Sequence, residues 1–203
     1  MELAFALLFI IPIIMFLALA YFTASTQIQL ASPQKTPASP KLAPRGDGLP
    51  SIPRTAQEVL TTMDDKEFEW FSAAIVMGTR DGYRFYRHCG GSGDQGIDAK
   101  LWNPWKVLVG VQSKFYIPSN TVSSEEMRNF LGSLVNQQIA YGYFVTTSTF
   151  TRDAQQVVDG ASGRIRAIDG QNIDAYLRWQ SREISLAWRE ILAWREAQKK
   201  GAA

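Results

Sequence analysis

The chain has 203 residues, of which 46% are hydrophobic, which is enough for one globular domain with smaller segments attached. It holds a single cysteine and a single histidine, which excludes disulfide-built scaffolds and zinc fingers because both need several such residues. The formal net charge is +2, from 21 basic and 19 acidic residues, and this is too small for a histone-like nucleic-acid binder. Any binding to a polyanion must therefore use basic residues gathered on one face.

The first segment of the chain is an apolar stretch over residues 3–22 without a charged side chain. At about 1.5 Å per residue it spans the ~30 Å hydrocarbon core of a bilayer, so the sequence predicts a transmembrane anchor over residues 1–22. Pro12 predicts a kink within it. The alternative is a cleaved signal peptide, but Glu2 and the absence of a preceding Lys or Arg favour the uncleaved anchor.

The next segment, residues 23–54, contains six of the nine prolines among Ser, Thr, Ala and Gln. This composition cannot bury a core and predicts an extended, disordered linker. Lys35 and Lys41 follow the apolar stretch, whereas only Glu2 and the amino terminus precede it, so the positive-inside rule favours a cytoplasmic C-terminal side. We expect a membrane protein with a single span and a domain over residues 55–178 in the cytoplasm.

Hydrophobic periodicity across this domain predicts alternating helices and strands. A dense β-branched run over 107–115 is expected at the centre of a sheet, Ser123 and Glu126 form a capping-box pattern, and Gly78 is expected to end the first helix. The pattern predicts an α/β fold, a mixed sheet flanked by helices. The helices are expected at 64–77, 123–139, 151–158 and from 171 onward, and the strands at 83–86, 97–102, 107–115, 141–147 and 164–168.

Polar residues gather where these strands end. Asp98 lies on the second strand, Gln112 and Lys114 share one face of the third, and Glu69 lies on the preceding helix. Carboxylate and amide oxygens suit Mg²⁺, so Asp98, Glu69 and Gln112 are candidate metal ligands, with Lys114 placed to orient water or offset phosphate charge. Each of these residues also has a simpler interpretation. Asp98 could only close a turn, and Gln112 and Lys114 could be the polar face of an edge strand. Glu67 is the alternative to Glu69 as the helical acid.

Five segments carry a family resemblance in order and spacing: FEWF at 68–71, SGDQGIDAK at 92–100, VQSK at 111–114, GYFVTTSTFTRDA at 142–154 and IDGQNI at 168–173. Together they resemble, over residues 64–177, the catalytic domain of Mrr-type restriction endonucleases, a QxK branch of the PD-(D/E)XK nucleases. The resemblance implies a restriction-endonuclease-like fold and hydrolysis of DNA with Mg²⁺, for which Mn²⁺ can substitute. It also implies metal binding by Asp98, Gln112 and Glu69, catalysis by Lys114, and DNA restriction of foreign or modified DNA.

Several further residues are candidates for DNA contact. Arg84 and Arg87 are expected to contact the DNA backbone, although most such arginines are only solvated. Thr147, Ser148 and Arg152 lie near the start of helix 151–158, where the hydroxyls either cap the helix or hold a phosphate. The glycine-rich loop at 90–96 is more often a hairpin loop than a phosphate cradle. His88 and Cys89 are interpreted as structural.

The C-terminal extension, residues 179–203, continues a Trp-rich helix with apolar residues spaced by three and four. Two alternatives remain open for this seam. It packs on its own domain, or it serves a homodimer or a partner helix, and a dimer would suit an enzyme that cuts both strands. The seam comprises Ile173, Leu177, Gln180, Ile184, Ala187, Ile191 and Trp194.

Two functions compete on these observations. The first is a membrane-anchored, Mg²⁺-dependent DNA endonuclease. The second is a non-catalytic nuclease-fold module that binds nucleic acid or a protein partner at the membrane. The joint presence of Asp98, Gln112 and Lys114 favours the first, because a retired site has no chemical reason to keep all three.

Overall fold

The structure is a computed structural model that describes residues 49–90 and 96–201, all within the compact unit Arg45–Ala203. The predicted membrane segment, the linker up to residue 48 and the glycine-rich residues 91–95 lie outside the described residues. Among the helices that are described, none combines the length and apolar character that a membrane span needs.

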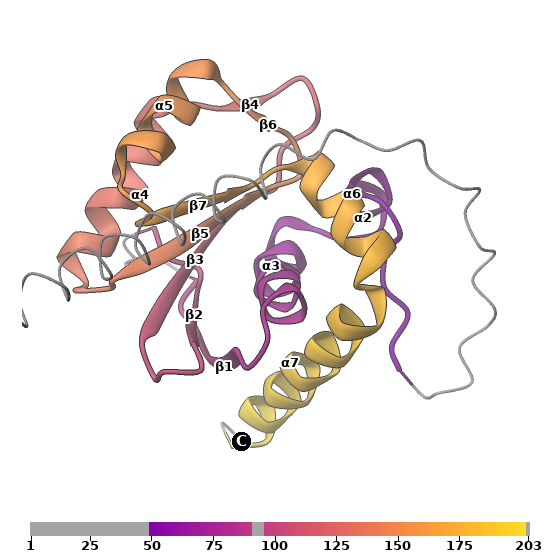
Figure 1. Cartoon of the computed structure of the whole chain (residues 1–203). Coiled ribbons are helices and arrows are strands. Elements are labelled where there is room, and N and C mark those ends of the chain that lie inside the picture. Colours follow the sequence, from indigo (N-terminus) through magenta and orange to yellow (C-terminus); the bar gives the residue numbers. More distant parts are fainter. Residues whose placement is uncertain (1–48, 91–95, 202–203) are drawn as a thin grey trace, which may run out of the picture. The chain divides into compact units, whose positions relative to one another are not determined.

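A five-stranded mixed sheet forms the centre of the domain, in the order β1-β2-β3-β5-β7 (Figure 1). The first two pairings, β1–β2 and β2–β3, are antiparallel, whereas β3–β5 and β5–β7 are parallel. The β-branched run 107–115 is the middle strand, which confirms the predicted central position. The strands are β1 (Arg84–His88), β2 (Ala99–Trp102), β3 (Leu108–Lys114), β5 (Tyr141–Thr146) and β7 (Ile165–Ile168).

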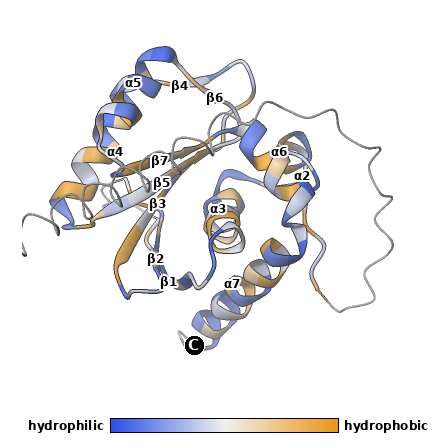
Figure 2. Ribbon diagram, in the orientation of Figure 1, coloured by the Kyte–Doolittle hydropathy of each residue, from blue (hydrophilic) through white to orange (hydrophobic). Residues whose placement is uncertain are grey.

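Helices cover both faces of this sheet, so the predicted mixed sheet flanked by helices is confirmed (Figure 1). On one face α3, α6 and α7 share a core with the strands, and on the other α4 and α5 do. Apolar residues lie on strands such as β7, whereas α5 is largely hydrophilic (Figure 2). The helices are α2 (Ala56–Thr62), α3 (Asp65–Thr79), α4 (Ser124–Asn136), α5 (Arg152–Gly160), α6 (Gly170–Trp179) and α7 (Ser181–Gly201).

The first predicted helix does not end at Gly78, so that expectation was wrong. Helix α3 continues to Thr79, and Gly78 lies inside it against α7. A Cβ atom built on Gly78 would lie 2.6 Å from the backbone Cα of Ile184, which is far inside van der Waals contact. Glycine at this position therefore permits close approach of α3 and α7. The packing of the two helices outweighs the low helix propensity of glycine.

The long helix predicted from residue 171 onward is two helices, α6 and α7, separated at Gln180. The seam is therefore not continuous. Ile184 and Ile191 of α7 are fully buried, and Trp188 packs edge-on against Phe71 of α3 at a ring distance of 5.5 Å. Of the two alternatives for this segment, packing on its own domain is the one the structure shows.

Three short elements escaped the sequence analysis. Helix α2 has only seven residues, capped by Thr55, and it is tied to α6 by a 2.6 Å hydrogen bond from the Ala56 amide to Asp174. Strands β4 (Thr121–Val122) and β6 (Thr149–Phe150) have two residues each and pair in parallel. Such short segments carry too few residues for a recognisable period.

Candidate active site

The predicted site residues Asp98, Gln112 and Lys114 come together where β2 begins and β3 ends, which we call the site edge of the sheet. Asp98 immediately precedes β2, and the register that pairs Ala99 with Val111 brings it opposite Gln112 of β3. Lys114 is the last residue of β3. Because β2 and β3 are antiparallel, the start of one strand and the end of the other coincide.

The Asp98 carboxylate is buried, with 5% of the residue exposed, and its orientation is fixed by hydrogen bonds. Its Oδ2 atom accepts three of them: from Gln112 Nε2 at 2.9 Å, from the Ser113 amide at 2.6 Å and from Ser113 Oγ at 2.7 Å. Ser113, which sequence reasoning missed, therefore supplies two of the three donors. Its position inside the QSK motif was visible, but its contact with Asp98 depends on strand pairing.

The Gln112 side chain is satisfied on one side only. Its amide nitrogen binds Asp98, but its oxygen Oε1 is buried without a hydrogen-bond partner in the described part of the chain. A Cβ atom on Gly96 would lie 3.3 Å from this oxygen, so the glycine keeps its surroundings uncrowded. An unpaired buried acceptor costs about 1–3 kcal/mol, which indicates that it has another partner in function.

The donor set at this edge fits a hard divalent cation. The Asp98 carboxylate and the Gln112 amide oxygen are ligands of the kind that Mg²⁺ binds. Within residues 49–90 and 96–201, no three His, Cys, Asp or Glu side chains gather closely enough to hold an ion.

Lys114 lies beside Glu126 of helix α4. The Lys114 Nζ atom lies 3.9 Å from Glu126 Oε1, and 37% of the lysine side chain is exposed. Burial acts to raise the pKa of Glu126, but hydrogen bonds from Ser123 and Tyr116 and the charge of Lys114 outweigh it, so the pKa is lowered. The Tyr116 hydroxyl donates to Glu126 at 2.6 Å, which raises the pKa of Tyr116 to about 12. Glu126 is thus an anion that stabilises the positive charge of Lys114.

Glu126 was predicted only as the capping residue of its helix, and that prediction is confirmed. Its Oε2 atom accepts the Ser123 amide at 2.9 Å, and the Ser123 hydroxyl accepts the Glu126 amide at 3.3 Å. The same carboxylate therefore serves α4 locally and Lys114 across the fold. Only the local contact leaves a signal in the sequence.

Glu69 of α3 is joined to the same edge through His88. Its Oε2 atom lies 2.8 Å from His88 Nε2, and His88 pairs with Ala99, the neighbour of Asp98. Glu67 lies in the first turn of α3, where its amide binds the capping Asp64. These contacts support Glu69 as the helical acid, and its role in the site stays a prediction.

The two hydroxyl residues predicted to contact DNA are used inside the fold. Thr147 is 4% exposed and donates to the Tyr116 carbonyl at 2.7 Å, and Ser148 is 3% exposed and donates to the Asn120 carbonyl. Helix α5 is capped by Thr151 and not by either of them. Their burial and these bonds do not favour a phosphate contact, so that expectation finds no support in the geometry.

The predicted arginine contacts remain available at the surface. Arg84, Arg87 and Arg152 are all exposed. Arg84 donates to the Tyr83 carbonyl at 3.0 Å, and the Arg87 guanidinium lies 5.6 Å from the ring centre of Tyr86. Arg87 pairs with Lys100, two residues beyond Asp98 on β2, so it lies beside the site edge.

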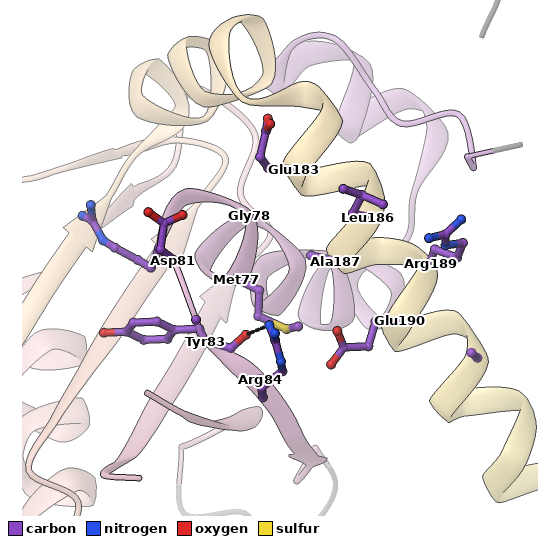
Figure 3. Close-up of a pocket in the computed structure, with 13 residues that line it drawn as sticks. Met77, Gly78, Asp81, Tyr83, Arg84, Glu183, Leu186, Ala187, Arg189 and Glu190 are labelled. Carbon is purple, nitrogen blue, oxygen red and sulfur yellow. Dashed lines mark hydrogen bonds between the residues drawn. The ribbon is translucent and has the colours of Figure 1, made fainter. Parts of the chain in front are cut away.

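A separate hollow of about 560 Å³ lies where the end of α3 and the start of β1 meet α7 (Figure 3). Its apolar floor includes Met77, Leu186 and Ala187, and none of the four predicted catalytic residues lines it. Its lining also includes three basic and three acidic residues: Arg80, Arg84, Arg189, Asp81, Glu183 and Glu190. This mixture of charges matches no single ligand class.

Comparison with known proteins places the chain in a family. Residues 60–177, more than half of the chain, match the Mrr_cat family model, described as restriction endonuclease. The chain belongs to this restriction endonuclease family. The matched range agrees with the 64–177 expected from the sequence motifs, so the predicted resemblance is confirmed for the nuclease domain.

Individual relatives show how far the likeness extends. The type IV methyl-directed restriction enzyme EcoKMrr of Escherichia coli K12 is 36% identical over 86 residues, which cover 41% of this chain and 27% of the relative. The chain thus matches about a quarter of that enzyme.

Two solved structures are similar in fold. The DNA modification-dependent restriction endonuclease AspBHI gives a TM-score of 0.51 at 19% identity, over 78% of this chain and 44% of AspBHI. The restriction endonuclease MspJI, solved with a 27-mer oligonucleotide, gives 0.50 at 19% identity, over 68% and 34%.

Proposed function

We propose that this chain is a membrane-anchored, metal-dependent DNA endonuclease that hydrolyses phosphodiester bonds. The observation that carries the proposal is the arrangement at the β2–β3 edge, where a fixed Asp98 carboxylate meets a Gln112 oxygen that is buried and has no hydrogen-bond partner among residues 49–90 and 96–201. Lys114 lies two residues beyond Gln112, on the same side of β3. Membership in the restriction endonuclease family supports DNA as the substrate.

In this proposal Asp98 and Gln112 hold Mg²⁺, or Mn²⁺ in its place, and Glu69 is a further acid of the site. The ion, when bound, would polarise a phosphoryl oxygen and make a bound water more acidic. Ser113 keeps the Asp98 carboxylate in one orientation through its two hydrogen bonds. The Lys114 ammonium group offsets negative charge that develops on the phosphate. The Glu126 carboxylate helps to hold this ammonium group in place.

The wider role rests on the apolar segment and on the relatives. Residues 3–22 anchor the chain in a membrane, residues 23–54 form a linker, and the nuclease domain at 55–178 lies in the cytoplasm. Defence against foreign or modified DNA is the proposed role, because EcoKMrr is named methyl-directed and AspBHI modification-dependent. Arg84, Arg87 and Arg152 are the proposed contacts with the DNA backbone.

The proposal is tested on the purified full chain with methylated and unmethylated plasmid DNA and Mg²⁺ or Mn²⁺. We expect metal-dependent nicking that falls by ~10²-fold or more in Asp98→Asn and in Lys114→Ala, since each removes a charge at the reacting centre. The matched controls Asp153→Asn and Lys66→Ala change exposed residues of α5 and α3 and should cut as the wild type does.

Two results would count against the nuclease. Equal cutting by wild type and Asp98→Asn would place the active centre elsewhere. A folded wild-type chain that binds DNA and never cuts it, with either metal, would instead support the non-catalytic binding module.

A further inference from the structure

A line of ring contacts runs from the C-terminal helix to the site acid Glu69. Trp194 of α7 lies 5.7 Å from Trp70 of α3, measured between ring centres, and 5.2 Å from Phe85 of β1. Trp70 in turn stacks on His88 at 4.0 Å with an angle of 9° between the planes. His88 Nε2 then reaches Glu69 Oε2 at 2.8 Å.

We propose that His88 is a positioning residue that orients the Glu69 carboxylate towards the metal site, and that α7 fixes the His88 ring through Trp194 and Trp70. This inference rests on the proposed function, because it takes Glu69 as an acid of that site. It gives α7 a role beyond core packing.

Two consecutive residues of α3, Glu69 and Trp70, hold the His88 imidazole. Trp70 fixes the plane of the His88 ring by stacking, and the Glu69 carboxylate accepts a hydrogen bond from His88 Nε2. The Glu69 side chain has several rotatable bonds, so an unsupported carboxylate would lose rotamer freedom on binding an ion. Because His88 already holds the Glu69 carboxylate in the folded protein, this side-chain entropy is lost on folding and not on binding the ion. Carboxylate ligands of metals are commonly held by such outer partners.

The pair is shielded from solvent, which strengthens its hydrogen bond. Only 17% of the His88 side chain and 23% of the Glu69 side chain are exposed. An imidazole with a proton on Nε2 donates to the carboxylate whether the ring is neutral or charged. The positioning role therefore needs no change of protonation.

Gly90 provides an independent sign that the backbone is built around this pair. A Cβ atom on Gly90 would lie 2.5 Å from Glu69 Oε2 and 2.5 Å from His88 Cε1. Only glycine lets the chain pass so close to both side chains. Because both clashing atoms belong to side chains and not to the backbone, alanine here would displace the pair and leave the core intact.

Two residues of α7 contact the Trp70 ring. Besides Trp194, the Arg195 guanidinium lies 5.3 Å from the Trp70 ring centre. Phe85 stacks on the same ring at 5.8 Å. The ring that orients His88 is therefore held by residues of both β1 and the C-terminal helix.

The experiment measures Mn²⁺ binding to the full chain by calorimetry without DNA, together with kcat and KM for plasmid cleavage. His88→Phe keeps a ring on Trp70 but removes the hydrogen bond, and Trp194→Ala removes the contact from α7. We expect each to weaken Mn²⁺ binding by about 10- to 100-fold and to lower kcat, with KM for DNA within about twofold. The conservative Trp194→Phe should restore most of the loss.

Trp179→Ala is the matched control, since Trp179 is 70% exposed and should leave Mn²⁺ binding unchanged. If His88→Phe does not fold, as judged by circular dichroism, Gly90→Ala tests the same pair and should weaken Mn²⁺ binding to a similar extent.

The outcomes separate this inference from the proposed function. If the His88→Phe and Gly90→Ala chains bind Mn²⁺ as wild type does while Asp98→Asn loses it, the positioning role is wrong and the nuclease stands. If only Trp194→Ala behaves as wild type, the part assigned to α7 is wrong. A wild-type chain that neither binds Mn²⁺ nor cuts DNA overturns the proposed function, and this inference with it.

Discussion

The two ends of the central sheet both carry buried polar side chains, but they use them differently. At the start of β5, the Tyr143 hydroxyl accepts hydrogen bonds from Arg166 Nη1 at 2.8 Å and Arg80 Nε at 3.2 Å, and the hydroxyls of Tyr83 and Tyr141 lie 2.6 Å apart. These phenol groups satisfy one another and the arginines. At the opposite end, the Gln112 oxygen is buried without a partner in the described residues. Polar groups paired within the protein stabilise the fold, whereas an unpaired acceptor points to a ligand.

The two ends of the sheet also differ in the direction in which the pKa values of their acidic groups are shifted. Burial and hydrogen bonds to Tyr141 and Tyr143 raise the pKa of Tyr83 above its usual range, so its hydroxyl stays neutral. At the site end the pKa of Glu126 is lowered instead, and its negative charge faces Lys114. One end is a network of phenol hydroxyls with the guanidinium groups of Arg80 and Arg166 over its rings, and the other brings the Glu126 carboxylate beside the Lys114 ammonium group.

The largest expected effect that tests this contrast comes from Gln112→Met, which keeps the side-chain length and removes the amide. Cleavage should fall by ~10²-fold or more, because the candidate ligand oxygen is lost. The unfolding temperature should stay within about 3 °C, because the lost bond to Asp98 is offset by removal of an unpaired buried oxygen. Plasmid nicking and calorimetric unfolding of the same preparation measure both quantities.

Two outcomes would break the contrast at this position. A fall of more than about 8 °C would make Gln112 a stabilising group like the tyrosines, since such a shift corresponds to at least ~2 kcal/mol in a domain of this size. Cleavage at the wild-type rate would remove Gln112 from the site.

The opposite pattern is expected for Tyr143→Phe, at the other end of the sheet. This change removes the oxygen that accepts from Arg80 and Arg166, so the free energy of unfolding should fall by about 1–3 kcal/mol. Cleavage of DNA should stay within about twofold. Denaturant unfolding gives the first quantity, and Tyr86→Phe is the control: Tyr86 is 42% exposed and should change stability by less than about 0.5 kcal/mol. A large loss of activity in folded Tyr143→Phe would show that the two ends are coupled.

The parts of the fold that the sequence predicted depend on local patterns. The capping box of Ser123 and Glu126 marks the start of α4, and the β-branched run 107–115 marks the central strand β3. Gly78 was misread because glycine has two uses in a helix, ending it or admitting a neighbour, and only the contact with Ile184 decides between them. The break at Gln180 was missed because apolar spacing continues across it.

The same division applies to the candidate site. Strand periodicity was enough to gather Asp98, Gln112 and Lys114 at one edge. The partners of these residues could not be predicted, because they lie far apart in the chain: Glu126 beside Lys114, and His88 beside Glu69. The only histidine was interpreted as structural, and its contact with a predicted site acid appears only once α3 and β1 are packed together.

The smallest expected effect concerns acid stability and Glu126→Gln. The pKa of Glu126 in the folded protein is lowered below its ordinary value of about 4.3, so its contribution to stability is full above that pH and is lost as the pH falls through the folded pKa. At pH 7 the variant should be less stable by up to ~1 kcal/mol, since it keeps the capping geometry but loses the charge. This difference should shrink between pH 5 and pH 3 in urea unfolding. A Glu126→Gln difference that is unchanged at pH 3 would mean that Glu126 stabilises α4 by hydrogen bonding alone, and the charge contrast between the two ends would fail.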